Sequence, residues 1–193
     1  LRDHGVLGTA ILFFLLQQPI QLQELRGCIG DHALSALHRM GWLSLGGSGV
    51  RCRVSLYPCA GQFFWTDHSA PLEPWGEQVY WLGEDSYTLA YCTSRMPRQR
   101  SLDLCTGSGV HAILAAGHCG ESLGIDINPR ALEFGRLNAT FNGCNTQFHS
   151  SDCYAQVTGD FDLITLNPPF APAPAGTSEL YRAGGPTGET VTD

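Results

Sequence analysis

The four residues at positions 167–170, Asn-Pro-Pro-Phe, follow the apolar and β-branched run LITL, which is typical of a β-strand. Proline cannot donate to a sheet ladder, so a strand that stops here presents its groups to something else. The Asn167 side-chain oxygen and the Pro168 carbonyl can each accept one N–H of a planar –NH2 group, on which Phe170 can stack. Both acceptors favour charge that builds on that nitrogen as it attacks an electrophile. A rigid strand exit with a core Phe is the alternative.

A second motif, DLCTGSGVHA at residues 103–112, runs from a strand-like segment through a glycine turn into a helix-like segment. Gly107 and Gly109 allow backbone angles and a close approach that side chains would block. The helix start behind them exposes unpaired N–H groups to a ligand. A tight structural turn is the alternative when this motif is taken alone.

Two acidic residues lie where later strands are expected to end. Asp126 lies in GIDI, at the end of the second strand, where a carboxylate can accept both hydroxyls of a ribose. Asn128, with Pro129 after it, is the better helix N-cap, which leaves Asp126 for a ligand. Asp152 follows the third strand, beside the expected adenine position, or else it is an ordinary strand-end turn. A nicotinamide enzyme would fit these acids, but it has no use for Asn-Pro-Pro-Phe.

Together these stretches resemble the class I S-adenosylmethionine-dependent methyltransferases, and more narrowly the methyltransferase small domain group. That group includes release-factor glutamine, ribosomal RNA guanine-N2 and tRNA adenine-N6 methyltransferases. The resemblance covers residues 85–193 and rests on DSYTLA, LDLCTGSGVHAI, GIDINPRALEFGRLNATFNG, SDCY, NPPF and YRAGGPTGE. It implies S-adenosyl-L-methionine as the cofactor, methyl transfer to an amide or exocyclic amine nitrogen, and no metal.

The resemblance also implies a role for each motif residue. The expected acceptor-binding, catalytic residues are Asn167, Pro168, Pro169 and Phe170. The expected cofactor-binding residues are Asp103, Thr106, Gly107, Ser108, Gly109, Val110, Asp126, Ile127, Asp152, Cys153 and Asn167. Tyr87 and Thr88 are expected to close over the cofactor or substrate. Two residues depart from the family pattern: Cys105 replaces the usual first glycine of the loop, and Phe170 replaces the Tyr that is common in glutamine methyltransferases.

The elements that must position these residues alternate between strand and helix. Strands are expected at residues 101–105, 122–127, 146–152 and 161–166, and helices at 109–118 and 129–143. This order predicts an α/β, Rossmann-like, mostly parallel sheet. The family sheet has seven strands in the order 3-2-1-4-5-7-6, so the chain is expected to supply four and to be truncated after the fourth. A partner that covers the apolar edge of that strand is the alternative.

Residues 1–70 predict a small winged-helix-like α+β module, joined by a linker at 71–84 to the methyltransferase domain at 85–193. Helices are expected at residues 6–18, 20–27 and 31–41, and a β-hairpin at 50–57 and 62–67. A DNA-binding module would carry basic residues on its third helix. That helix has only Arg39 and two His beside Asp31, which favours a structural or protein-docking role.

Composition narrows the class of protein. The net charge is −7, and residues 101–193 hold only three Arg against ten acids, a poor footprint for duplex nucleic acid. Eight cysteines without a C-x-x-C motif predict free thiols in a reducing, cytoplasmic environment. The apolar run VLGTAILFFLL is too short to span a bilayer, so no membrane partner is expected.

The function that the resemblance favours is methylation of a protein glutamine side chain, as in the release-factor type. An RNA base methyltransferase is left open, because five Arg could form a modest basic strip, namely Arg51, Arg53, Arg95, Arg98 and Arg100. A non-catalytic cofactor-binding fragment is the alternative from another class.

Overall fold

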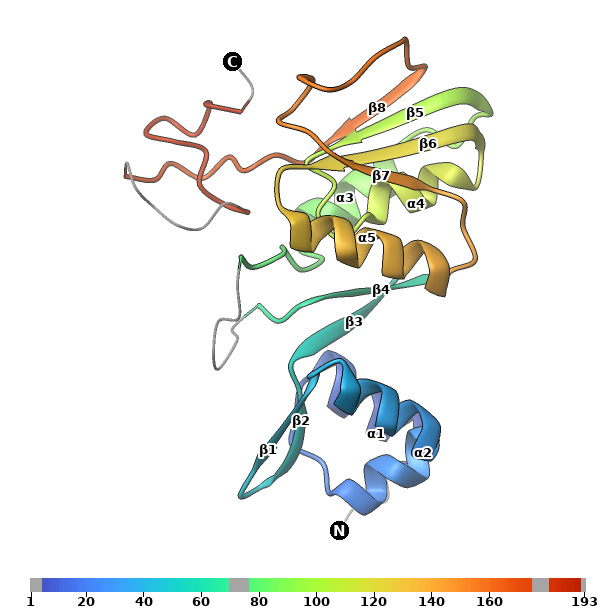
Figure 1. The fold of residues 1–193 in the computed structure, drawn as a ribbon, viewed down its shortest axis with the longest axis vertical. Helices are drawn as coiled ribbons and strands as arrows, with labels where there is room; N and C mark the ends of the chain where they lie inside the picture. The colour runs from blue at the N-terminus through green and yellow to red at the C-terminus, as the bar shows by residue number, and fades with distance from the viewer. Residues whose placement is uncertain (1–4, 70–76, 175–180, 192–193) are drawn as a thin grey trace. The chain divides into compact units, whose positions relative to one another are not determined.

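The computed structural model describes residues 5–69, 77–174 and 181–191 (Figure 1). The chain divides into two compact units, Leu1–Tyr57 and Pro58–Asp193. The module boundary near residue 70 and the linker at 71–84 stay predictions, and most of that linker lies outside the described residues.

The first unit contains α1 (Gly5–Ala10), the π-helix η1 (Ile11–Leu15), α2 (Leu22–Arg39), β1 (Leu43–Gly46) and β2 (Gly49–Cys52). The helix expected at 6–18 is thus an α-helix that continues as a π-helix. Gly30 has non-helical angles (φ 77°, ψ 164°) inside α2, which divides it into two helical segments, as the sequence predicts. The winged-helix resemblance of this unit stays a prediction.

The hairpin of the first unit differs from the one expected. β1 pairs antiparallel with β2, so the hairpin forms across the GGSG turn rather than after it. The run at 50–57 is divided at Arg53 between β2 and β3 (Val54–Cys59). Arg53 N donates to Trp42 O at 2.8 Å, which extends the β1–β2 register by one pair. Gly49 begins β2 at φ +129°, and a Cβ there would lie 2.6 Å from the Ile20 carbonyl oxygen. A glycine is therefore required at this corner.

The second unit holds β4 (Gln62–Asp67), α3 (Glu84–Cys92), β5 (Arg98–Leu104), α4 (Val110–Ala116), β6 (Cys119–Asp126), α5 (Pro129–Phe141), β7 (Gln147–Ser150) and β8 (Leu163–Leu166). Its parallel sheet has the strand order β7-β6-β5-β8. The Rossmann-like α/β fold is confirmed, with the first four strands in the expected 3-2-1-4 order. The sequence interpretation assigned no element to residues 84–92, where the structure has α3.

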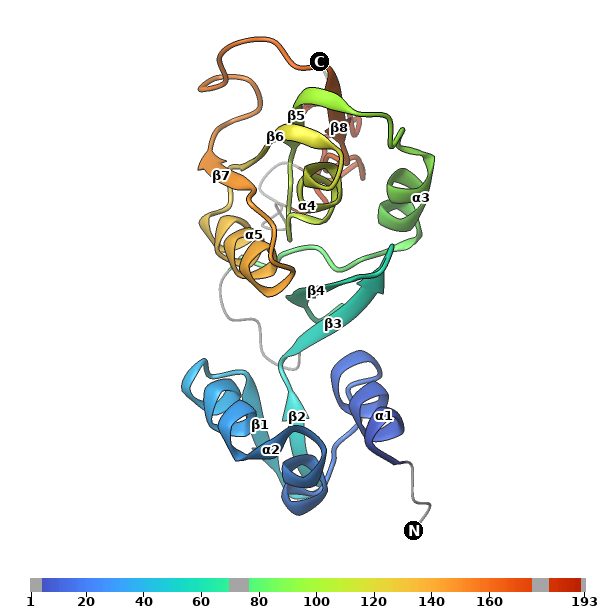
Figure 2. The ribbon, with the colours of Figure 1, turned by 90° about the vertical axis from the view of Figure 1, so that its right-hand side faces the viewer.

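Helices α3, α4 and α5 cover one face of this sheet (Figures 1 and 2). On the other strand face, Leu102, Leu104 and Ile125 form a buried cluster, against which Val157 and Phe161 pack from the connection after β7. β8 lies at the edge of the four-stranded sheet, and its Ile164 is 47% exposed. The expected apolar edge at the fourth strand is therefore present in the described sheet.

The ring of Phe148 on β7 sets how closely α5 approaches the sheet. A Cβ added to Gly124, Gly135 or Gly109 would lie 2.7, 2.6 or 2.9 Å from an atom of this ring. At these three positions only a hydrogen atom fits between the backbone and the ring, so each requires glycine.

Among the described residues, no helix is long and apolar enough to cross a membrane.

Candidate functional site

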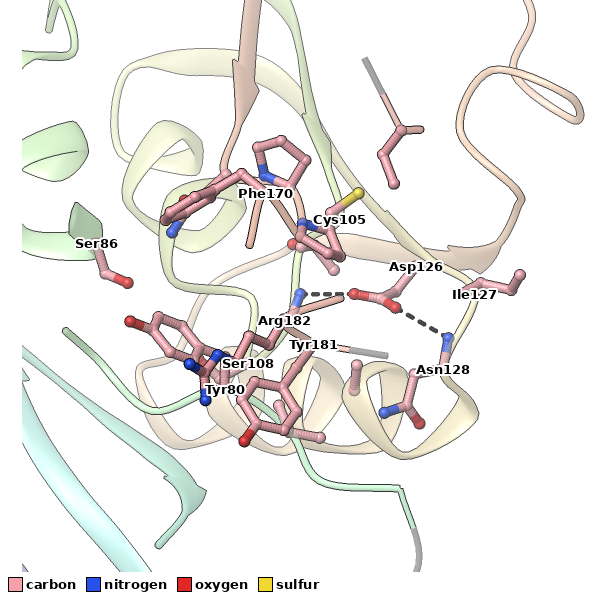
Figure 3. Close-up of a pocket in the computed structure, with 18 of the residues that line it drawn as sticks. Tyr80, Ser86, Cys105, Ser108, Asp126, Ile127, Asn128, Phe170, Tyr181 and Arg182 are labelled. Carbon is pink, nitrogen blue, oxygen red and sulfur yellow. Dashed lines mark hydrogen bonds between the residues drawn. The ribbon is translucent and has the colours of Figure 1, made fainter. Parts of the chain in front are cut away.

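A cavity of about 560 Å³ lies at the carboxyl ends of the sheet strands (Figure 3). Ligands of open α/β sheets bind at this edge, because the loops after all parallel strands meet there. Every residue expected to bind the cofactor or the acceptor through the motifs at 103–110, 126–127, 152–153 and 167–170 lines the cavity except Asp103 and Gly109. The expected residues that line it are Thr106, Gly107, Ser108, Val110, Asp126, Ile127, Asp152, Cys153, Asn167, Pro168, Pro169 and Phe170.

Asp126, at the end of β6, joins the glycine loop to the start of α5. Its carboxylate accepts hydrogen bonds from Gly107 N at 2.8 Å and from Asn128 N at 2.9 Å (Figure 3). Burial raises the pKa of Asp126 above its ordinary value, and these N–H donors partly offset the shift. Asn128 caps α5 by accepting from Arg130 N at 2.9 Å, as the sequence predicts. Asp126 is thus a partly exposed acceptor on the cavity wall.

Asp103 lies beneath the glycine loop. It is 1% exposed, and its two carboxylate oxygens accept hydrogen bonds from the Thr106 hydroxyl at 2.6 Å and the Thr165 hydroxyl at 2.7 Å. Burial raises the pKa of Asp103, while His111 and the two threonine hydroxyls lower it. Asp103 on β5 therefore binds the glycine loop through Thr106 and the neighbouring strand β8 through Thr165.

Cys105 adopts the conformation that glycine favours. Its φ is +53°, in the left-handed region, which explains why a glycine is usual at this place in the loop. Burial raises the pKa of the Cys105 thiol to about 12, and nearby Asp126 adds to the rise. Cys105 and Cys153 both line the cavity, and both are free cysteines. The neutral Cys105 thiol is therefore a packing group in this wall.

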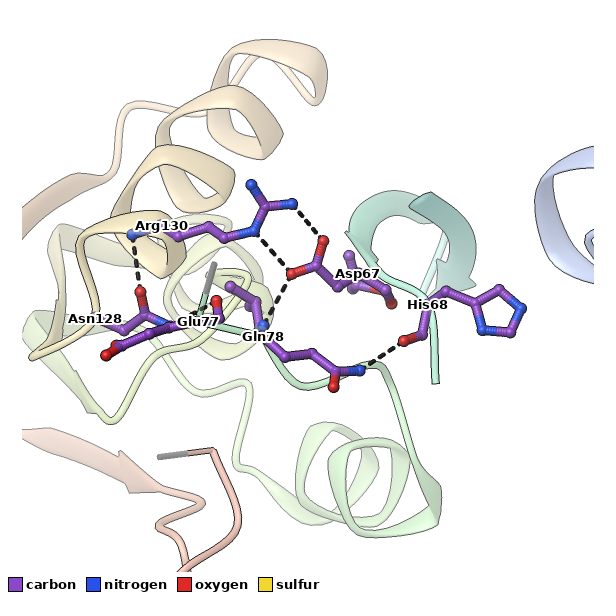
Figure 4. Close-up of polar contacts among 8 residues, drawn as sticks. Asp67, His68, Glu77, Gln78, Asn128 and Arg130 are labelled. Atoms are coloured by element: carbon purple, nitrogen blue, oxygen red, sulfur yellow. Dashed lines mark hydrogen bonds and ion pairs between the residues drawn. The ribbon is translucent and has the colours of Figure 1, made fainter. Parts of the chain in front are cut away.

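Residues 78–82 form a wall of the cavity that the sequence interpretation left as linker. Figure 4 shows how it is anchored: Asp67, at the end of β4, accepts from Val79 N at 3.0 Å and from Arg130 Nε at 2.9 Å. A second guanidinium nitrogen of Arg130 also contacts the Asp67 carboxylate. Asn128 Nδ2 donates to the Glu77 carbonyl at 3.3 Å. The pair of Asp67 and Arg130 therefore holds the wall against α5.

Three aromatic rings that the sequence interpretation missed also line the cavity. The ring centroids of Tyr80 and Trp81 lie 4.7 Å apart, and each ring lies 6.0 Å from Tyr181. The Tyr80 hydroxyl donates to Asp85 Oδ1 at 3.1 Å. Burial and the Asp85 carboxylate raise the pKa of Tyr80 to about 12, so the hydroxyl stays protonated. Only the fold brings 80 and 181 together, so no sequence spacing could have indicated this cluster.

The strand tip at residues 167–170 contacts the start of α3. Asn167 Nδ2 donates to Asp85 Oδ2 at 2.9 Å, and Phe170 lines the cavity with 60% of its surface exposed. Tyr87 and Thr88 do not line the cavity; the Tyr87 hydroxyl donates to the Pro58 carbonyl at 2.9 Å. Asp85 and Ser86, in the first turn of α3, are the α3 residues in the wall.

Comparisons with known proteins agree with this geometry. The family model of the methyltransferase small domain matches residues 85–182. A Methanocaldococcus jannaschii protein whose name proposes protein N5-glutamine methyltransferase activity is 35% identical over 96 residues, 49% of each chain. The release factor glutamine methyltransferase of Agrobacterium fabrum is 36% identical over 86 residues, which cover 42% of this chain and 30% of that protein. The chain thus spans half or less of the length of these relatives.

A solved structure shares the fold. The Thermus thermophilus 16S rRNA N2 G1207 methyltransferase, solved in complex with AdoMet and guanosine, superposes with a TM-score of 0.50 at 20% identity. The match covers 67% of this chain and 36% of that one. The family model spans half of the chain and includes the loop, the cavity acids and the strand tip. The resemblance is confirmed: the chain belongs to the methyltransferase small domain family of class I S-adenosylmethionine-dependent methyltransferases.

Proposed function

We propose that the protein is an S-adenosylmethionine-dependent N-methyltransferase whose acceptor is a planar –NH2 group, most consistent with a protein glutamine side chain. The observation that carries the proposal is Asn167, which lines the same cavity as Asp126 and donates its own –NH2 to Asp85. Its side-chain oxygen is then the atom that can accept from a substrate nitrogen.

The cavity fits the cofactor by the chemistry of its walls. Asp126 offers carboxylate oxygens to a ribose, and Gly107, at φ +54°, would carry a Cβ that meets no atom within 4 Å. The glycine therefore leaves open space that a side chain would fill. Cys153 and Asp152, after β7, are proposed to flank the adenine. When bound, the cofactor supplies an electrophilic methyl group on a sulfonium sulfur.

The residues of the strand tip have the proposed task of orienting the acceptor. Asn167 and the carbonyl of Pro168 accept the two N–H groups, Pro169 restrains the backbone, and Phe170 offers its exposed ring for stacking. Acceptance by fixed oxygens stabilises the positive charge that grows on the attacking nitrogen. After transfer, that nitrogen can lose its proton to solvent, so no protein base is required.

The charge distribution favours a protein acceptor over RNA. Of the Arg that could form a basic strip, Arg100 pairs with Glu121 at 2.9 Å, and Arg95 donates to the Ala90 carbonyl at 2.6 Å. Pairing with an acid reduces the attraction of Arg100 to phosphates. Two relatives named for glutamine methylation match this chain at 35% and 36% identity.

Transfer of labelled methyl groups from the cofactor into a cell extract tests the proposal. We expect protease treatment to release the label and nuclease treatment to leave it in large molecules. Acid hydrolysis of the labelled protein should release volatile methylamine, because the N-methyl amide bond is cleaved. Label released by nuclease instead indicates the RNA alternative, and cofactor binding without any transfer indicates a non-catalytic cofactor-binding chain.

A further inference from the structure

Asp85 and Asn167 lie 82 positions apart in the sequence and meet at the cavity. Asp85 is in the first turn of α3, Asn167 follows β8, and Asn167 Nδ2 lies 2.9 Å from Asp85 Oδ2. An ionised carboxylate can only accept hydrogen bonds. The amide of Asn167 must therefore turn its –NH2 toward Asp85. The oxygen and nitrogen of an amide have nearly the same shape, so the hydrogen-bond partner determines this orientation.

The second oxygen of Asp85 is held as well. The Tyr80 hydroxyl donates to Asp85 Oδ1 at 3.1 Å, and the Tyr80 ring stacks on Tyr181 with an interplanar angle of 21°. A Cβ on Gly83 would lie 2.6 Å from both Asp85 Oδ1 and the Tyr80 hydroxyl oxygen, so glycine leaves the space that this contact needs. Both carboxylate oxygens are thus engaged by protein donors, which keeps the carboxylate in one position.

We propose that Asp85 is a positioning residue. It fixes the Asn167 amide so that the Asn167 side-chain oxygen is the atom offered to the substrate nitrogen. This inference rests on the proposed function of Asn167. Without Asp85, the amide can rotate by half a turn about its last side-chain bond and offer Nδ2 instead. Nδ2 is a donor, and it would face the N–H groups of the acceptor rather than accept from them.

Kinetics of single variants test this role. Asp85→Ala should lower kcat about 10- to 100-fold, because the acceptor is then misplaced, while cofactor affinity changes little. Asp85→Asn should keep most of the activity, since its new amide oxygen can accept from Asn167 and its nitrogen can donate to Tyr80. Glu84→Ala is the matched control, because it removes the same charge from the same helical turn and Glu84 does not line the cavity. Normal kcat in Asp85→Ala would overturn the proposal.

A paired exchange separates positioning from a general loss of structure. Asn167→Asp places two carboxylates against each other at a 2.9 Å contact, so we expect activity to fall about 10-fold or more. Adding Asp85→Asn should restore much of it, because the amide introduced at position 85 can donate to the carboxylate introduced at position 167. Equal activity of Asn167→Asp with and without the Asp85→Asn change would refute the coupling.

The side-chain amide resonance of Asn167 reports the same contact without any turnover. The ¹H–¹⁵N signals that vanish in Asn167→Asp are those of this side chain. They should shift in Asp85→Ala and stay in place in Glu84→Ala. A shift in a protein that transfers no methyl group would support the positioning contact and refute the proposed function. An unchanged resonance in a protein that does transfer methyl would refute the positioning role and leave the proposed function standing.

Discussion

Asn138 on α5 hydrogen-bonds both backbone groups of Trp65 on β4. Its side-chain oxygen accepts from Trp65 N at 2.8 Å, and its Nδ2 donates to Trp65 O at 2.9 Å. The same nitrogen donates to the Ser108 carbonyl at 2.8 Å, in the glycine loop. Asn138 is 0% exposed. One buried amide therefore pairs with β4 as a neighbouring strand would, and it connects that strand to the cavity loop.

Asn138→Ala should destabilise the protein strongly, because it leaves three buried backbone groups without their partner. We expect a loss of unfolding free energy on the order of 3 kcal/mol, measured by urea denaturation. Asn142→Ala is the matched control one helical turn later, where the same two contacts join Asn142 to Phe63. Phe63 is 48% exposed, so water can replace that amide, and the loss should be about 1 kcal/mol or less. Equal losses in the two variants would contradict this explanation.

Asp126→Ala should weaken cofactor binding. The carboxylate is proposed to hold the ribose, and it also fixes Gly107 N in the loop. Loss of charge-assisted hydrogen bonds should cost roughly 1.5–3 kcal/mol of binding free energy, which calorimetry with S-adenosylhomocysteine measures. Asp160→Ala, an exposed residue outside the cavity, controls for the change in net charge. An unchanged affinity in Asp126→Ala would place the ribose elsewhere.

Asn167→Ala should bind the cofactor nearly normally and lose methyl transfer. The Asn167 oxygen acts mainly as charge develops on the attacking nitrogen, so the loss should appear in kcat. By analogy with an oxyanion-hole donor, the decrease should be about 10²- to 10³-fold in a single-turnover assay. Near-normal kcat would mean that the strand tip is only a rigid exit from the sheet.

The pH dependence of stability should reveal Asp103. Burial raises its pKa above the ordinary 3.8, so the folded protein binds this proton more tightly than the unfolded chain. The resulting stabilisation is complete below the ordinary pKa and is lost as the pH rises through the raised one. The unfolding free energy of the wild type should therefore fall relative to Asp103→Asn as the pH rises from below 4. A difference that is constant with pH would show that Asp103 does not titrate abnormally.

The sequence alone was sufficient to predict the sheet and the part of the cavity lining that follows its strands. Strand–helix alternation predicts parallel strands, and parallel strands bring their carboxyl ends to one edge, so the residues that follow them had to meet. The cap at Asn128 follows from local chemistry, since Asn is favoured at the N-cap and Pro at the first position of a helix. The exceptions Asp103 and Gly109 are residues of the same motif whose contacts are with neighbouring elements rather than the cavity.

Only the tertiary structure decided which distant residues became partners of these motifs. No period or motif relates Asp85 to Asn167, Asp67 to Arg130 or Asn138 to Trp65. Each pair joins elements that are distant in the sequence, and Asp67 and Asn138 are buried, so their polar groups need the partners that the other element supplies. Local sequence determines which backbone groups an element leaves unpaired, whereas the packing of whole elements determines which side chain reaches them.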